Sequence, residues 1–146
     1  MKQYDPNRVW ERVQSPPGPD SQSLEPLIGI LAPQLRALHQ LTRKLPVPQA
    51  TMARELYRQL QRHLACLKGM QVLISGTPPK LPPGPAPTDP PDLLLRQCYA
   101  QTLRLRTEYE ARRSDPAYGH IFRLLSNEIP EQSCRILELL GMLQSQ

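Results

Sequence analysis

His63 is the residue whose chemistry and surroundings first suggest a site in this sequence. It shares one face of a helical pattern with Leu60, Leu64 and Leu67, so its imidazole is directed toward an apolar core. An imidazole in that position can ligate a metal or move a proton, although a buried neutral histidine held by one hydrogen bond is the more common arrangement. His63 is therefore interpreted as a structural histidine unless other ligands converge on it.

The other residues that could react do not form recognisable sets. Cys66, Cys98 and Cys134 are odd in number and far apart, with no C-x-x-C or Cys/His pairing, which argues against a disulfide framework and a zinc site. His39 and His120 have no partner motif, and the sequence contains no glycine-rich phosphate loop and no Ser-His-Asp or Cys-His pattern. We therefore expect reduced thiols in a cytosol, no enzymatic activity, no cofactor, and no catalytic or metal-binding residues.

Arginine is the other residue type whose spacing could indicate function. The net charge is +5, and Arg54, Arg58 and Arg62 recur every four residues, with Lys68 beyond them. A second group follows later in the chain: Arg104, Arg106, Arg112 and Arg113. Such stripes can neutralise phosphates of a nucleic acid. Acidic residues are interspersed, however, and arginine stems cover apolar surface on many helices, so a solvated face is the favoured interpretation.

Four amphipathic helices are expected to position these residues. The first covers about 23–44 and the second about 48–76, and the short link between them predicts antiparallel neighbours. An Asp-Pro pair, with Asp as the N-cap, marks the start of the third helix at Asp89 and of the fourth at Asp115. The predicted inner face of the fourth helix is Ile121, Phe122, Leu125, Ile129, Gln132, Ser133, Ile136 and Leu140.

A proline-rich segment at 77–91 separates the two helical pairs. Eight of its 15 residues are proline, so it cannot be helix or central strand and should form an extended polyproline II strap. At roughly 3.1 Å per residue the strap spans about 45 Å. The second helix would be about 40 Å long at 1.5 Å per residue. The second and third helices are therefore predicted to run parallel, with the strap along the outside of the bundle.

The N-terminal residues 1–22 lie outside the predicted helices and the strap. Residues 1–22 contain the run SPPGP and no sustained period, so they are expected to form a flexible tail. Val9, Trp10 and Val13 could form one apolar turn that docks on the bundle or binds a partner. Residues 23–146 are expected to be one domain with a leucine-built core. The sequence has no stretch of 18 apolar residues and no signal-like N-terminus, so a cytoplasmic protein without membrane association is predicted.

The bacterial rubrerythrin-like branch of the ferritin-like four-helix bundles is the family that this sequence resembles. The resemblance is carried by LYRQLQRHLACLKGMQVLISG, by the proline-rich strap, and by LLLRQCYAQTLRLRTEYEARRSDPAYGHIFRLLSNEIPEQSCRILELLGML. It covers residues 24–143 and implies an all-α, up-down-down-up four-helix bundle in which the strap is the long crossover. Members of this family carry Glu on the first and third helices and Glu-x-x-His on the second and fourth, which hold two metal ions.

Most of the ligand positions implied by this resemblance have lost their ligands. The four positions read Leu31, Leu60-Gln61-Arg62-His63, Thr102 and Ile129-Pro130-Glu131-Gln132. Of the implied ligands, only His63 matches. A shift of one residue would bring Glu128 or Glu131 nearer, but it would rotate either side chain about 100° off the core face. Iron, manganese and zinc need several converging ligands, so the sequence predicts a degenerate dimetal site.

The function predicted from the sequence is therefore that of a non-catalytic ferritin-like bundle, a structural or protein-interaction module in a bacterial cell. Its partner would be another protein or a second copy of itself. Non-specific nucleic-acid binding through the arginine-rich faces is the alternative, followed by residual metal binding or redox activity. Relatives by resemblance occur among spore-forming bacteria, and no residue of this sequence demonstrates a spore-associated role.

Overall fold

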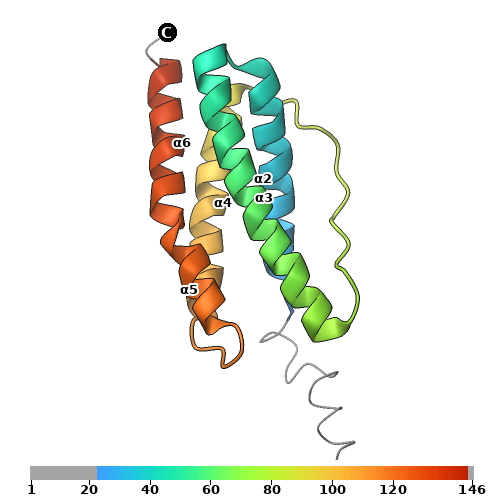
Figure 1. The fold of residues 1–146 in the computed structure, drawn as a ribbon. Coiled ribbons are helices and arrows are strands. Elements are labelled where there is room, and N and C mark those ends of the chain that lie inside the picture. The colour runs from blue at the N-terminus through green and yellow to red at the C-terminus, as the bar shows by residue number, and fades with distance from the viewer. Residues whose placement is uncertain (1–22, 145–146) are drawn as a thin grey trace, which may run out of the picture.

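A computed structural model describes residues 23–144, which form a bundle of four helices (Figure 1). The elements are α2 (Glu25–Lys44), α3 (Val47–Ser75), α4 (Pro91–Ala111), α5 (Gly119–Asn127) and α6 (Ile129–Gln144). The fourth helix of the bundle is divided between α5 and α6. No β-strand occurs among the described residues, so the predicted all-α class is confirmed. The tail predicted at 1–22 lies outside the described part of the chain.

Helices α2 and α3 form an antiparallel hairpin whose ends lie within two residues of the predicted ones (Figure 1). Helix α3 ends, as predicted, at Gly76. This residue has a φ of 79°, a left-handed conformation that glycine adopts without strain. Its N–H donates to the carbonyl oxygen of Val72 at 2.7 Å, which satisfies one of the last carbonyls of the helix.

The predicted start of α4 is wrong by one position. Pro90, not Asp89, is the N-cap residue, and the helix begins at Pro91 with no side-chain cap. The ring of a proline disfavours helical backbone in the residue before it. Pro91 therefore holds Pro90 extended, with a ψ of 153°, and Asp89 is left one residue too far from the helix to cap it.

The predicted start of the fourth helix at Asp115 is also wrong. The carboxylate of Asp115 accepts hydrogen bonds from the N–H groups of Ala117 and Tyr118 at 2.9 and 2.8 Å, but these bonds close a turn. Helix α5 begins later, at Gly119. A side chain at this position would collide with the carbonyl oxygen of Arg113, so only glycine fits the close approach of the two backbone segments.

The fourth helix was predicted as one element, and it is broken at Glu128. The N–H of Glu128 donates to the carbonyl of Leu125 at 3.2 Å, which is the tighter bonding of a helix end. Pro130 in the first turn of α6 has no N–H to donate to Ser126. The helical ladder is therefore interrupted at this point, and α6 starts as a new helix.

The core is built mainly from leucine, as expected. Five of the residues predicted on the inner face of the fourth helix are buried: Phe122, Leu125, Ile129, Gln132 and Ile136. Ile121, Ser133 and Leu140 are only half-buried, and Leu139 is fully buried instead. None of the helices in residues 23–144 combines length with the apolar character needed to cross a membrane.

The proline-rich strap leaves the end of α3 and passes along the outside of α2 before it reaches α4 (Figure 1). Two side chains of α2 hold it there. Arg36 Nη1 donates to the carbonyl oxygen of Pro82 at 3.0 Å, and Gln40 Nε2 donates to that of Pro87 at 3.3 Å. The strap is therefore fixed to α2 through its backbone, while most of its side chains remain exposed.

Candidate functional site

The positions that the family resemblance assigns to metal ligands lie in the bundle core and are mainly apolar. Leu31, Leu60 and Ile129 are all buried and belong to one cluster. Thr102 is buried as well, and its hydroxyl donates to the carbonyl of Cys98 at 2.8 Å. Within residues 23–144, no three His, Cys, Asp or Glu side chains are placed to share a metal ion. Leucine and isoleucine offer no lone pairs, so these residues do not fit a dimetal centre.

His63 is instead the centre of a buried polar cluster. Its Nδ1 lies 2.9 Å from the hydroxyl of Tyr109 on α4. Its Nε2 lies 3.3 Å from a carboxylate oxygen of Glu128, between α5 and α6, and 3.3 Å from the amide nitrogen of Gln132 on α6. We call these four residues the His63 cluster. The cluster connects α3 to α4 and to both parts of the fourth helix.

The partners of His63 favour one tautomer. A carboxylate can only accept a hydrogen bond, so Glu128 requires a proton on Nε2, and Nδ1 is then the acceptor for the hydroxyl proton of Tyr109. The opposite tautomer would leave the carboxylate without this donor. The Nε2–H form therefore satisfies both Tyr109 and Glu128, whereas the amide nitrogen of Gln132, which is also a donor, gains no hydrogen bond from His63 in this form.

Burial controls the protonation states in the cluster. Loss of solvation lowers the pKa of His63, and the carboxylate of Glu128 acts in the opposite direction. Burial raises the pKa of Tyr109 above its ordinary value, and the charge of Glu128 adds to this effect. Burial also raises the pKa of the Cys98 thiol to about 12. At neutral pH these three side chains are uncharged, and none of them is an activated nucleophile.

Glu128 is the member of the cluster that sequence reasoning placed off the core face. In one continuous helix Glu128 lies about 100° around the axis from buried Ile129, at the edge of the core face rather than at its centre. The break between α5 and α6 falls at this residue, yet its backbone is helical and the N–H of Gln132 donates to its carbonyl at 3.2 Å. Glu128 therefore lies one turn before buried Gln132 and is itself half-buried. Glu128 also lies 3.4 Å from Arg62 and thus connects the buried imidazole to an exposed guanidinium.

A second polar contact joins α2 to α4. Gln34 Nε2 donates to the hydroxyl of Thr102 at 2.6 Å and is 3.3 Å from the carbonyl of Cys98. Seven residues separate Thr102 from Tyr109, so the two polar layers are about 10 Å apart along α4. Sequence reasoning missed Gln34, although its position three residues after Leu31 and four before Leu38 places it on the apolar stripe.

The interior can therefore orient helices but offers no accessible reaction centre. Gln34, His63, Thr102 and Tyr109 are each 0% exposed. The side-chain oxygens of Gln34 and Gln132 are buried without a hydrogen-bond partner in the described residues. Each polar layer joins helices from the two sides of the strap, so together they fix how the helices pair.

The remaining candidate residues are dispersed over the surface. His120 is exposed, and His39 is exposed beside Tyr57, with their ring centroids 5.9 Å apart. Cys66 and Cys134 are exposed as free thiols and lie on different helices. The structure does not bring these residues together into a site.

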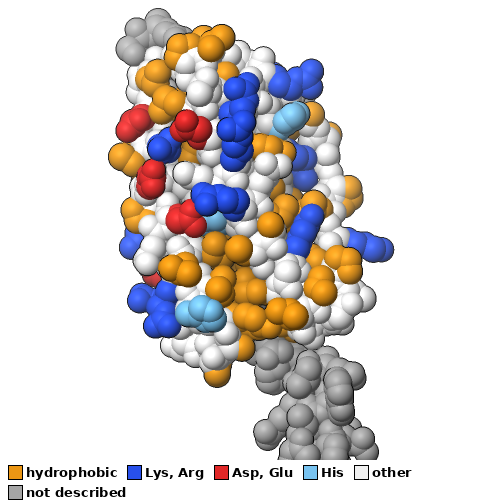
Figure 2. All heavy atoms as spheres, viewed as in Figure 1, with side chains coloured by type: hydrophobic (Ala, Val, Ile, Leu, Met, Phe, Trp, Pro, Cys, Tyr) orange, Lys and Arg blue, Asp and Glu red, His pale blue; other side chains and the backbone are white. Residues whose placement is uncertain are grey.

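The arginine stripe lies on a mixed face. Arg62 pairs with Glu128, whereas Arg54 and Arg58 are exposed and have no ion pair within residues 23–144. In the second group, Arg106 and Arg112 pair with Glu110 and Glu108 at 3.1 and 2.7 Å. Figure 2 shows basic and acidic side chains interspersed over the upper part of the visible face, with hydrophobic side chains gathered below them over α3 and α5.

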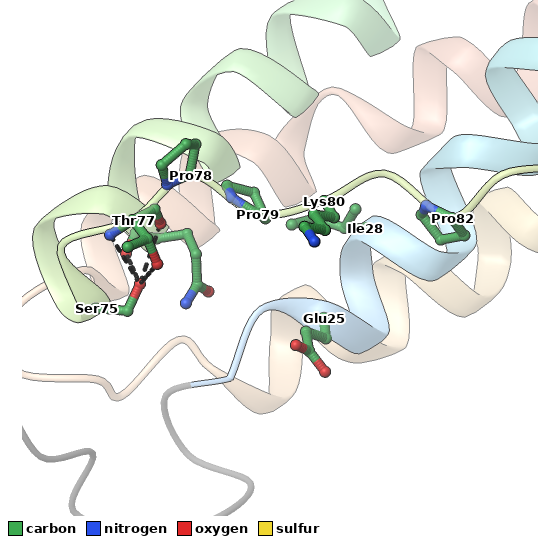
Figure 3. Close-up of a pocket in the computed structure, with 9 residues that line it drawn as sticks. Glu25, Ile28, Ser75, Thr77, Pro78, Pro79, Lys80 and Pro82 are labelled. Carbon is green, nitrogen blue, oxygen red and sulfur yellow. Dashed lines mark hydrogen bonds between the residues drawn. The ribbon is translucent and has the colours of Figure 1, made fainter.

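Two hollows lie beneath the strap. One has a volume of about 670 Å³ and is lined by the first turns of α2, the last turns of α3 and the first residues of the strap. Figure 3 shows Glu25 and Lys80 on opposite sides of it, with Ser75 and Thr77 hydrogen-bonded to each other at one end. The other hollow has a volume of about 570 Å³ and lies further along the strap.

Comparison of the chain with family models, curated proteins and solved structures found no match. The ferritin-like assignment therefore rests on the sequence resemblance described above. It remains a hypothesis that the helical architecture permits.

Proposed function

We propose that this protein is a non-catalytic ferritin-like bundle that acts as a structural or protein-interaction module. In this proposal the helices run up-down-down-up and the proline-rich strap is the crossover between α3 and α4. The path of the strap along α2 supports this topology (Figure 1). The resemblance and the unpaired cysteines favour a bacterial cytoplasmic protein.

The observation that supports a non-catalytic role most directly is the composition of the core at the implied metal positions. Leu60 and Ile129 are 2% and 1% exposed, and they pack where the family carries carboxylates. The one retained ligand, His63, is held by Tyr109 and Glu128. A buried and satisfied imidazole contributes to stability and helix pairing, not to turnover.

An interaction role is supported by exposed apolar side chains over α3 and α5 (Figure 2). Leu73 near the end of α3 is 69% exposed, and Leu124 on α5 is 61% exposed. Large apolar side chains that gather on a surface mark sites where proteins associate. We therefore propose that exposed apolar side chains of α3 and α5, among them Leu73 and Leu124, contact a second copy or another protein, and we call them the α3–α5 surface.

Sedimentation velocity over a range of concentrations tests this proposal. We expect the wild-type protein to self-associate and Leu73→Glu to remain monomeric, because a charge on the α3–α5 surface must lose its solvation on association. Leu137→Glu on α6 is the matched control, since Leu137 is 50% exposed on a different helix. If the wild type is monomeric, a photo-crosslinking residue at 73 should capture one defined protein that the same residue at 137 does not. Failure of both experiments would contradict the interaction role.

Nucleic-acid binding is the second candidate, because Arg54 and Arg58 are exposed and have no ion pair within the described residues. Arg104 and Arg113 of the second group are also exposed without an ion pair in this part of the chain, but they lie on or beyond the end of a different helix, α4. The acidic side chains between the arginines weaken nucleic-acid binding further. We therefore place this function below the first.

A further inference from the structure

The hollow of about 570 Å³ beneath the strap has the form of a small-molecule site, and we call it the strap groove. Its floor is mainly apolar, with Ala32, Leu35 and Leu64, and the amide side chains of Gln40 and Gln61 line it as well. Its roof is formed by Leu81, Gly84 and Ala86 of the strap. Ligand sites of this kind are concave, mainly apolar and have volumes of roughly 300 to 1,000 Å³. The strap groove falls within that range.

The charge of the strap groove has one sign. Arg36 from α2 and Lys68 from α3 line it together with His39, and no Asp or Glu is among the lining residues. Lys68 forms no ion pair within residues 23–144. Arg36 donates to the carbonyl of Pro82, which occupies one of the five N–H groups of a guanidinium. Donors therefore remain for an anion in the groove.

The roof is held in place by the same residues. The guanidinium of Arg36 packs so closely on the strap that a Cβ at Gly84 would lie 2.7 Å from its Nη2. Gln40 fixes the strap again at Pro87. The positive charge and the apolar roof are thus in place before any ligand arrives, which lowers the conformational cost of binding.

We propose that the strap groove binds an amphipathic anion, namely a monocarboxylate with an alkyl chain. Arg36 and Lys68 would receive the carboxylate, and the apolar floor and roof would cover the chain. Lys68 and Tyr57 both line the groove and are eleven residues apart on α3, a distance of about 16 Å, which accommodates a chain of about ten carbons. A cationic amphiphile of the same length meets only like charge there.

Titration calorimetry with decanoate, below the concentration at which it forms micelles, tests the proposal. Decanoate should bind at one site, whereas decyltrimethylammonium should not bind. Lys68→Met keeps an apolar stem but removes the charge, so decanoate should bind about tenfold more weakly. Arg58→Met is the matched control, because Arg58 is exposed on α3 and does not line the groove. It should leave the affinity unchanged.

A second variant tests the apolar half of the site. Leu81→Ser removes an apolar side chain from the roof without altering any helix, and it should also weaken decanoate binding. Far-UV circular dichroism confirms that each variant is folded. Three results would overturn the proposal: no binding of decanoate, equal binding of the cationic amphiphile, or equal losses in Lys68→Met and Arg58→Met.

Discussion

A buried carboxylate at position 60 would need a cation beside it, whereas Leu60 belongs to a core cluster of apolar side chains. Leu31, Leu60 and Ile129 are buried in one core cluster, and the nearest implied ligand position on α4 carries Thr102. A metal ion would normally compensate the burial of charge at such a centre. In this protein apolar packing takes that place, so the stability of the core should not depend on metal.

Replacement of Leu60 by Glu tests whether the core has become independent of metal. The variant should lose on the order of 3 kcal/mol or more of unfolding free energy, because apolar packing is removed and an unpaired charge is buried. Chemical denaturation of wild type and Leu60→Glu, each with and without ferrous or manganous ion, measures the loss. A variant as stable as the wild type, or one restored by metal, would show that a metal-binding scaffold persists.

His63 should make stability depend on pH. Burial lowers its pKa in the folded state below the ordinary value of 6.5, so the unfolded chain takes up the proton first as pH falls. The stability that the neutral, buried His63 permits is fully present above about pH 6.5. Below that pH the free energy of unfolding falls, with a slope approaching about 1.4 kcal/mol per pH unit.

The measurement is denaturation between pH 7 and pH 5 for the wild type and for His63→Gln, which cannot take up this proton. The wild type should lose more stability over this interval than the variant. His39 and His120 are present in both proteins, so their effects cancel in the comparison. Parallel pH profiles would mean that His63 keeps its ordinary pKa.

Some residue positions could be predicted from periodicity and others could not. The burial of His63, Thr102 and Gln132 follows from their place on helical stripes, and the structure confirms it. The contact of Glu128 with His63 was not predicted, because Glu128 lies at the edge of the core face and the contact joins two helices that are far apart in sequence. Periodic reasoning therefore identified the core but not the partner of its buried imidazole.

At the scale of elements, the two predicted helix starts failed for different local reasons. The Asp-Pro pairs at Asp89 and Asp115 are good start signals, yet neither aspartate caps its helix. Pro91 delays α4 by its effect on Pro90, and the close approach of Gly119 to Arg113 delays α5. The stop at Gly76 depends only on the local conformation of one glycine, and it was predicted correctly.

The outer face of α3 should bind duplex DNA only weakly. At physiological salt the dissociation constant should be no tighter than about 10⁻⁴ to 10⁻⁶ M, the range of non-specific binding. Two of its arginines lack an ion pair within the described residues, and Glu128 holds Arg62. Fluorescence anisotropy with a labelled duplex checks this. Submicromolar binding that weakens when Arg54, Arg58 and Arg62 are replaced by Gln would favour the nucleic-acid function instead.

At the scale of the whole molecule, the bundle should purify with far less than one equivalent of iron, manganese or zinc. Of the six implied ligands only His63 is present, and its two ring nitrogens already face Tyr109 and Glu128. Elemental analysis of protein from metal-supplemented cultures, with ferroxidase and peroxidase assays, measures this. Stoichiometric metal at the bundle centre would contradict the proposed loss of the dimetal site.

The helical class was predictable because four long periodic segments and one proline-rich segment leave few alternatives. The strap groove could not be predicted. It depends on hydrogen bonds from Arg36 and Gln40 to the strap backbone, and these partners are about 46 residues apart in the sequence. Contacts of that separation leave no local pattern. Surface hollows formed by such contacts can be found only in three dimensions.

The strap also divides the chain into two pieces that could exist apart. Residues 23–76 and 91–144 each contain a helical hairpin, and α2 packs on α4 across the divide through Gln34 and Thr102. Expressed as separate chains, the two halves should reassemble, with a concentration dependence that the intact protein lacks. Covalent linkage makes this association intramolecular, with an effective concentration set by the length and stiffness of the strap. Besides covering the strap groove, the strap would then act as a tether. Comparison of the unfolding free energies of the split and intact proteins would measure the effective concentration that it supplies.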